Sequence, residues 1–302
     1  MLKSHEGQTN PHYVTIDLDI PRTFPEHPQL NSPEIVSKVR NVLQTYSWYN
    51  SHIGYCQSMS YIVAMASLLF TEEEDLFCLL VRLFEKIQDY HSSGMRSARV
   101  DMKVIDSLMQ KYTPKLYSHL LHHQLSGEVF CIEWFLTLFS KSFPPEFVFR
   151  CWDSLLLEGD KILFRLALSI CMHLEPIILS PENENKSPMG ISKIHSSSCV
   201  AVDSIMKTGF KIWNFSRSMI ADLRSKGTVD IEKEYEQVNQ IKQRMEKRRA
   251  KTEQKEEEEH NHETGEGTTS SSSPSDVPST ETAPNNATEG EQEKDKEQSS
   301  ST

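Results

Sequence analysis

The chain has 302 residues, of which 37% are hydrophobic, and a formal net charge of −11. This length and composition allow one large buried core or two small ones. From residue 251 onward there are 14 acidic residues and 4 lysines, which together make −10 and leave −1 for the first 250 residues. The acidity therefore belongs to the C-terminal segment and does not indicate what the folded part binds. We expect no nucleic-acid partner.

Cysteine spacing and hydropathy narrow the class of protein further. Six cysteines are spaced 20 or more residues apart, without a CxxC motif. This spacing indicates reduced cysteines rather than a disulfide framework or a metal site. The longest strongly apolar run, 61–70, is half the length of a membrane span, and no apolar signal segment stands at the start. We therefore predict a cytoplasmic protein without a membrane span, for which peripheral recruitment to endomembranes remains open.

Helix signals dominate the first two thirds of the chain, with no run that alternates apolar and polar residues over the length of a strand. Ser32-Pro33-Glu34 predicts an N-cap and a first helical turn, and that helix should end near Tyr49. Residues 58–70 are apolar on nearly every face, which is typical of a central helix, and 71–74 (TEEE) predicts a capping box for the next one. Further helices are predicted at about 100–112, 114–122, 127–139, 145–157, 161–179 and 205–223.

The last part of the chain differs in composition. Between Val229 and Arg249 apolar residues recur amid many charges, which predicts a charged helix or short coiled coil over 223–255 and makes self-association one option. Residues 256–302 are mainly polar or acidic and rich in Ser, Thr and Glu, so they predict a disordered acidic tail that cannot offset the entropy of ordering. The folded domain is therefore predicted over 1–222, with its motif-bearing core at about 12–168.

A first polar motif lies near the N-terminus, where residues 16–25 read IDLDIPRTFP. Prolines flank Arg22, so we predict a stiff, non-helical segment that holds the guanidinium outward. Asp19, three residues earlier, is suited to orient it. Taken alone, the same residues are more typical of an exposed surface arginine in an ion pair with Asp17 or Asp19, because such pairs are common and contribute little.

A second polar motif follows one predicted helix later, where residues 54–59 read GYCQSM. Gln57 stands at a predicted junction of loop and helix. Its amide both donates and accepts, which suits a group that orients a water between a carbonyl and a phosphate. The alternative is that Gln57 caps the helix or bonds the backbone, and Tyr55 and Cys56 beside it have the character of packing residues.

Together, IxxDxxR ending at Arg22 and YxQ at Tyr55 to Gln57 resemble the two signature motifs of the TBC domain, the catalytic domain of Rab GTPase-activating proteins. The resemblance spans about 155 residues. It continues through the segments Asp89-Tyr90-His91, 134–139 (WFLTLF), 150–153 (RCWD) and 163–168 (LFRLAL).

The resemblance implies an all-α, multi-helix domain that acts in trans on a GTP-bound, Rab-type small GTPase and so regulates vesicle trafficking. Arg22 would be the arginine finger and Gln57 would position the attacking water, with Asp19 and Tyr55 as supports. GTP and magnesium would be bound by the partner, so this chain would be a GTPase activator without a cofactor of its own.

The family pattern has several helices ahead of the arginine finger, whereas 21 residues precede Arg22 here. The resemblance therefore leads us to expect an N-terminally truncated copy of the domain. The alternative function is a Rab-binding or scaffold module whose catalysis is impaired, with the charged helix as its adaptor element.

Overall fold

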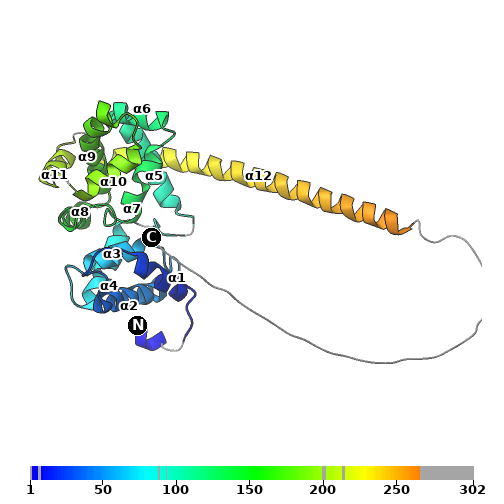
Figure 1. The fold of residues 1–302 in the computed structure, drawn as a ribbon, viewed down its shortest axis with the longest axis horizontal. Coiled ribbons are helices and arrows are strands. Elements are labelled where there is room, and N and C mark those ends of the chain that lie inside the picture. Colours follow the sequence, from blue (N-terminus) through cyan, green and yellow to red (C-terminus); the bar gives the residue numbers. More distant parts are fainter. Residues whose placement is uncertain are drawn as a thin grey trace, which may run out of the picture. The chain divides into compact units, whose positions relative to one another are not determined.

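The structure is a computed structural model that describes residues 2–5, 8–87, 89–92, 94–198, 202–212 and 215–265. These residues form helices, turns and loops and contain no strand (Figure 1), which confirms the predicted all-α fold class. The α-helices are α1 (His12–Asp19), α2 (Pro33–Tyr49), α3 (Ser58–Ala66), α4 (Glu73–Lys86), α5 (Arg96–Tyr112), α6 (Pro114–His122), α7 (Gly127–Leu136), α8 (Pro145–Glu158), α9 (Lys161–Ile178), α10 (Pro188–Ser198), α11 (Val202–Lys211) and α12 (Arg217–Gly265). The 3-10 helices are η1 (Leu2–His5), η2 (Ile20–Arg22) and η3 (Pro181–Asn183).

The chain divides into two compact units, Met1–Ile241 and Lys242–Thr302. Helix α12 contains the charged helix predicted over 223–255 and continues to Gly265. Its backbone therefore stays helical over the first ten residues of the predicted tail, where Glu and His residues follow Lys255. The extension begins with four Glu residues, 256–259, and Glu is a strong helix former. The rest of the predicted tail, 266–302, lies outside the described residues.

Two predicted helix starts have different outcomes. The Ser32 hydroxyl accepts a hydrogen bond from the Ile35 amide (3.4 Å), and α2 ends at Tyr49 as predicted. Helix α4 begins at Glu73 with Glu72 as its N-cap, and no side-chain hydrogen bond caps it. The capping box predicted at 71–74 is therefore wrong, and α4 relies on the three acids of its first turn, which favour a helix N-terminus.

The prediction of a non-helical segment around Arg22 is also wrong. Asp19 ends α1, and Arg22 ends the 3-10 helix η2. Pro21 fits near the start of η2, because a first-turn residue needs no N–H donor and proline already has a helical φ. The helical conformation stops at Thr23, which is extended.

Helix α3 is buried on nearly all sides, as its composition predicts. Every residue of α3 except Tyr61 is buried. The helix ends at Ala66, before the predicted end at 70, and the following residues form turns. This central helix begins directly after Gln57, so the second motif is fixed to the core at one end.

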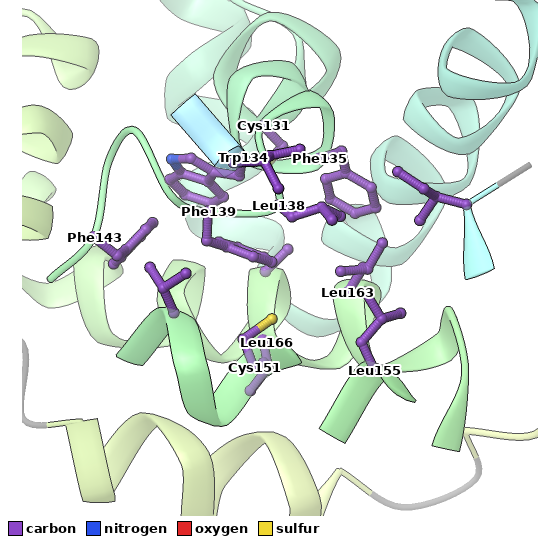
Figure 2. Close-up of a cluster of buried hydrophobic side chains, with 14 of the residues drawn as sticks. Cys131, Trp134, Phe135, Leu138, Phe139, Phe143, Cys151, Leu155, Leu163 and Leu166 are labelled. Atoms are coloured by element: carbon purple, nitrogen blue, oxygen red, sulfur yellow. The ribbon is translucent and has the colours of Figure 1, made fainter. Parts of the chain in front are cut away.

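The aromatic part of the core lies where α7, α8 and α9 meet (Figure 2). Phe135 packs edge-on against Phe164 of α9, with ring centroids 5.3 Å apart. Helix α7 stops at Leu136 rather than at the predicted 139, because Leu138 and Phe139 have φ values of 48° and 66°. The Trp152 indole donates to the Leu138 carbonyl (3.0 Å), which holds this turn against α8.

Candidate functional site

Arg22 and Asp19 form an ion pair at the end of α1. The Arg22 Nε donates to Asp19 Oδ1 (2.9 Å), and Nη2 contacts the same oxygen. The Asp19 side chain is 1% exposed and that of Arg22 is 61% exposed. Asp17 instead pairs with Arg40 (2.7 Å). The carboxylate that holds Arg22 is thus buried, unlike either partner of a typical surface pair.

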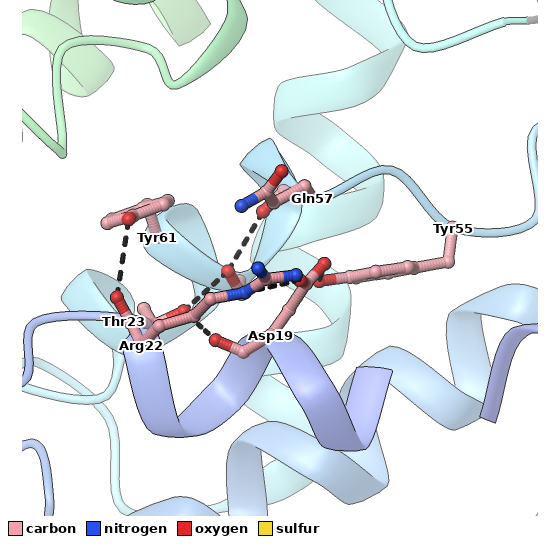
Figure 3. A network of polar contacts seen from close by, with 7 residues as sticks. Asp19, Arg22, Thr23, Tyr55, Gln57 and Tyr61 are labelled. Carbon is pink, nitrogen blue, oxygen red and sulfur yellow. Dashed lines mark hydrogen bonds and ion pairs between the residues drawn. The ribbon is translucent and has the colours of Figure 1, made fainter. Parts of the chain in front are cut away.

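Tyr55 holds the same carboxylate from its other side. The Tyr55 hydroxyl donates to Asp19 Oδ2 at 2.9 Å. Burial of the phenol, and the adjacent Asp19 carboxylate, raise the pKa of Tyr55 above its ordinary value, so the hydroxyl remains a donor. Each oxygen of Asp19 therefore has a fixed partner (Figure 3), and the orientation of the Arg22 guanidinium is fixed through it.

Gln57 precedes the first turn of α3, with φ −50° and ψ −36°. Its side chain makes no capping hydrogen bond, so the capping alternative does not hold in this structure. The side chain is exposed, and within the described part of the chain its amide is left for an external partner. The Gln57 backbone carbonyl accepts a hydrogen bond from the Ser60 hydroxyl (2.9 Å).

Two hydroxyl groups that the sequence interpretation did not single out connect the motifs. The Thr23 hydroxyl lies 2.9 Å from the Asp19 carbonyl and donates to the Ser60 hydroxyl at 2.7 Å. Ser60 in turn bonds the carbonyl of Gln57. Ser60 is fully buried. A serine within an otherwise apolar helix is the sequence signal that could have identified it, because a buried hydroxyl requires a partner.

Tyr61 borders the site on the other side of Arg22. Its hydroxyl donates to the Arg22 carbonyl at 3.4 Å, and its ring meets that of Phe24 edge-on, with centroids 5.2 Å apart. The Lys141 ammonium, from the connection between α7 and α8, lies 5.4 Å from the Tyr61 ring centroid. A second cation therefore stands near the site, from a segment far along the chain.

The site is suited to anions rather than to metals. Among the described residues, Asp19 is the partner of the Arg22 side chain and occupies one side of the guanidinium, so the donors on the exposed side can bind phosphate oxygens. A neutral amide that donates and accepts stands on the neighbouring element. Among the described residues, no group of three or more His, Cys, Asp or Glu is placed to hold a metal ion. The described helices also include none long and apolar enough to cross a bilayer.

Solved structures show a related fold. The crystal structure of the Chlamydomonas flagellar RabGAP TBC domain superposes with a TM-score of 0.61 and 32% sequence identity, over 70% of this chain and 70% of that chain. The crystal structure of the Ypt/Rab-GAP domain of Gyp1p superposes with a TM-score of 0.55 at 17% identity, over 76% of this chain and 78% of that chain, and shows likeness of fold alone.

Sequence comparison gives a consistent result. TBC1 domain family member 2B of Xenopus tropicalis is 37% identical over 183 residues, 59% of this chain and 19% of the relative. TBC1 domain family member 2A of Homo sapiens is 31% identical over 255 residues, 83% of this chain and 27% of the relative. The chain thus spans between a fifth and a little over a quarter of the length of these relatives. A family model described as the Rab-GTPase-TBC domain matches residues 1–179. The chain belongs to the Rab-GTPase-TBC domain family, which confirms the resemblance seen in its motifs.

Proposed function

We propose that this chain is a GTPase-activating protein for a Rab-type small GTPase, with Arg22 as the arginine finger and Gln57 as the residue that positions the attacking water. The observation that carries the proposal is the position of Arg22. It is an exposed arginine held by a buried carboxylate, and it is joined through Thr23 and Ser60 to an exposed glutamine. A surface ion pair would need none of this support.

Phosphoryl transfer requires few chemical groups from the activator. Phosphoryl transfer spreads negative charge over the oxygens of the transferring group, and a positioned cation stabilises that charge. Arg22 would bring its free donors to the phosphoryl group, while Asp19 keeps the guanidinium from turning away. Because Asp19 and Tyr55 fix it beforehand, little conformational entropy is lost when the partner binds.

Gln57 would act on the water. Its carbonyl oxygen would accept a hydrogen bond from the attacking water, and its NH₂ group would donate a hydrogen bond to the partner, so the water would be held in line with the phosphorus. GTP and magnesium would be bound by the GTPase. The activity would shorten the lifetime of the GTP-bound state and so regulate vesicle trafficking, at the cytoplasmic side of membranes to which this chain is recruited peripherally.

Single-turnover GTP hydrolysis by a panel of GTP-loaded Rab GTPases tests this proposal. We expect the full chain to accelerate at least one of them, and we expect Arg22→Ala and Gln57→Ala each to remove most of the acceleration. Arg40→Ala is the matched control, because Arg40 also pairs with an aspartate but both partners are exposed. It should retain the rate of the wild type.

Three outcomes would contradict all or part of the proposal. If the chain accelerates none of the Rab GTPases in the panel, it is not a Rab GTPase activator. Tight binding to the GTP-bound form without acceleration would instead support the alternative of a Rab-binding module. If acceleration survives both Arg22→Ala and Gln57→Ala, the roles of these two residues are wrong even though the activity stands.

A further inference from the structure

The turn that follows Arg22 contains an unfavourable backbone conformation. Phe24 has a φ of 52°, in the left-handed region that residues with a Cβ atom rarely adopt. Glycine is the usual residue for such a position, and a bulky aromatic one is an outlier. The turn must therefore be held by contacts outside itself.

The side chain of Asn31 supplies such contacts. Its Nδ2 donates to the Phe24 carbonyl (2.7 Å) and to the Pro25 carbonyl (2.8 Å), which uses both hydrogens of the amide. The backbone closes the same turn, because the His27 amide donates to the Phe24 carbonyl (3.0 Å) and the Asn31 amide donates to the His27 carbonyl (3.1 Å). Asn31 directly precedes Ser32, the N-cap of α2, so the turn is tied to the start of a long helix.

The opposite side of the turn is held by α3. The Phe24 ring packs against Tyr61, whose hydroxyl bonds the Arg22 carbonyl. Tyr61 thus restrains the ring and the chain before it, whereas Asn31 restrains the two carbonyls after it. The turn lies between two helices of the core.

Helix η2 cannot hold Arg22 by itself. It is a single 3-10 turn, closed by the hydrogen bond from the Thr23 amide to the Ile20 carbonyl (3.0 Å). Short 3-10 segments have little stability of their own. If the Phe24 turn opened, the backbone that carries Arg22 would lose its restraint on the C-terminal side. It would keep the contacts of the Thr23 hydroxyl and of Tyr61, and it would move more freely relative to Asp19.

We infer that Asn31 is a positioning residue for Arg22: its two hydrogen bonds hold Phe24 in the left-handed conformation and thereby fix the backbone from which the arginine projects. This inference rests on the proposed function of Arg22. It assigns Asn31 no contact with the partner or its nucleotide. The effect of losing Asn31 should therefore be on the rate at saturation and not on binding.

Asn31→Asp in the full chain is the sharpest test. The aspartate has nearly the same shape but cannot donate, and it places a carboxylate against two carbonyl oxygens. Asn183→Asp is the matched control. Asn183 follows α9, and its side-chain amide donates to the Ile177 carbonyl within that helix (2.8 Å). Asn31→Ala serves as a second variant that removes the donors without adding charge.

Backbone hydrogen exchange gives a readout that does not depend on any activity. In Asn31→Asp, the exchange rate of backbone amides in peptides covering 20–31 should rise about tenfold. A change of this size is expected when the turn loses the net stabilisation of about one hydrogen bond. Peptides covering 177–187 should be unchanged in that variant and faster in Asn183→Asp. Thermal unfolding of both variants shows whether each remains folded at the temperature of the measurement.

The rate measurement uses the Rab GTPase from the panel that the wild type accelerates. Asn31→Asp should lower the GTP hydrolysis rate at saturating concentrations of this chain between about tenfold and a hundredfold. The concentration of this chain that gives half of the maximal rate should change less than about threefold. Asn183→Asp should change neither quantity. Asn31→Ala should follow Asn31→Asp in direction.

The outcomes separate this inference from the proposed function. Unchanged exchange over 20–31 in both Asn31 variants overturns the inference, whatever the rates are. Faster exchange with an unchanged saturating rate shows that Asn31 holds the turn but does not position the arginine, which overturns it also. If the wild type accelerates no Rab, the proposed function fails and the positioning role fails with it, while the exchange result still decides whether Asn31 holds the turn.

Discussion

Two parts of the molecule are held by the same three residue types. At the candidate site, Asp19 binds Arg22 and Tyr55. Where α12 meets α5, Asp101 binds Arg224 through both carboxylate oxygens (2.6 and 2.7 Å) and accepts a hydrogen bond from Tyr90. Both aspartates are almost completely buried.

The surroundings of the two arginines differ. Arg224 has a second acid, Asp160, 2.6 Å from its Nη1, and its guanidinium stacks over Phe164. Arg22 is paired with Asp19 among the described residues and is almost twice as exposed as Arg224, at 61% against 33%. An arginine bound on two sides by acids is a structural element, whereas one bound on one side has donors left for a partner. The number of acids that bind the guanidinium, rather than the residue types around it, distinguishes Arg224 from Arg22, for which we propose a role in catalysis.

The Arg224 cluster belongs to a longer row of charges that fixes the first part of α12. Glu232 pairs with Arg96 (2.5 Å), and Glu234 pairs with Arg99 (2.8 Å) and Lys103 (2.8 Å). These acids lie on α12 and the three basic residues lie on α5. The first part of α12 is therefore anchored to the domain rather than being a free charged helix.

The largest expected effect is on rate, and it separates the two arginines. Arg22→Ala should lower the single-turnover hydrolysis rate of the accelerated Rab by about 10³-fold or more, because on the proposed function it would remove the cation from the transferring phosphoryl group. Arg224→Ala, measured at a temperature where it is folded, should change that rate less than about threefold. A comparable loss of hydrolysis rate in both variants would show that Arg224 does not have a purely structural role.

The second effect is on stability, where Arg224→Ala should have a larger effect than Arg22→Ala. Arg224→Ala leaves Asp101 buried without its cation, in a place where burial already raises the pKa of Asp101. We expect the free energy of unfolding to fall by about 3 kcal/mol in urea titrations. Arg22→Ala should cost less, because water can replace an exposed guanidinium beside Asp19. A larger loss for Arg22→Ala would contradict this interpretation.

The third effect is an acid sensitivity next to the Arg224 cluster. Burial lowers the pKa of His91 to about 4, against the opposing effect of its hydrogen bond to the Leu136 carbonyl. In the unfolded chain the group titrates near its ordinary value of 6.5, so between pH 6.5 and 4 the unfolded state binds the additional proton. Stability is therefore full above that window and falls as the pH drops through it.

At about pH 4.5 this contribution amounts to a loss of about 2 to 3 kcal/mol relative to neutral pH. His91→Gln can still donate to the Leu136 carbonyl but does not titrate, so it should lose less stability between about pH 7.5 and 4.5 than the wild type does. Urea unfolding at both pH values measures the difference. Equal losses would mean that His91 is not the acid-sensitive group.

The smallest effect concerns the hydroxyls that join the two motifs. Ser60→Ala and Ser67→Ala each remove a buried hydroxyl from the same segment, since Ser67 bonds the Ala64 carbonyl (2.6 Å) just after α3. Each should lower the free energy of unfolding by about 1 kcal/mol. Ser60→Ala alone should also lower the hydrolysis rate, by about threefold to tenfold, because it loosens Gln57 relative to Arg22. Equal hydrolysis rates in the two variants would show that the Ser60 hydroxyl does not contribute to the function of the site.

Much of the fold could be predicted because its signals are local. Ser32-Pro33 fixes the start of α2, and the largely apolar α3 could be recognised as buried. The extent of α7 could not be predicted, since its early end depends on the left-handed residues Leu138 and Phe139. Helices α1 and η2 were missed because prolines close to Arg22 favour a loop when the packing of Ile16 and Ile20 is not known.

The candidate site residues were proposed from the motifs, and their roles remain predictions, but their geometry could not be derived from the sequence. From spacing alone both Asp17 and Asp19 fit as the partner of Arg22, and the residue that pairs with Asp17 instead, Arg40, is 23 positions away from it. The contact between Asp101 and Arg224 spans 123 positions, so no local pattern indicates it. Asn31 gives no motif at all, because its importance depends on the conformation of Phe24.

The most direct test of the central claim is binding to a transition-state analogue. Such analogues bind more tightly than the ground state where a group contacts charge that develops during the reaction. The accelerated Rab, loaded with GDP and magnesium, is titrated with this chain in the presence and absence of aluminium fluoride. We expect the analogue to tighten binding of the wild type and of Arg224→Ala, and to leave the affinity of Arg22→Ala nearly unchanged. If Arg22→Ala gains as much affinity as the wild type does, Arg22 does not contact the transferring group, and the account of the site is wrong.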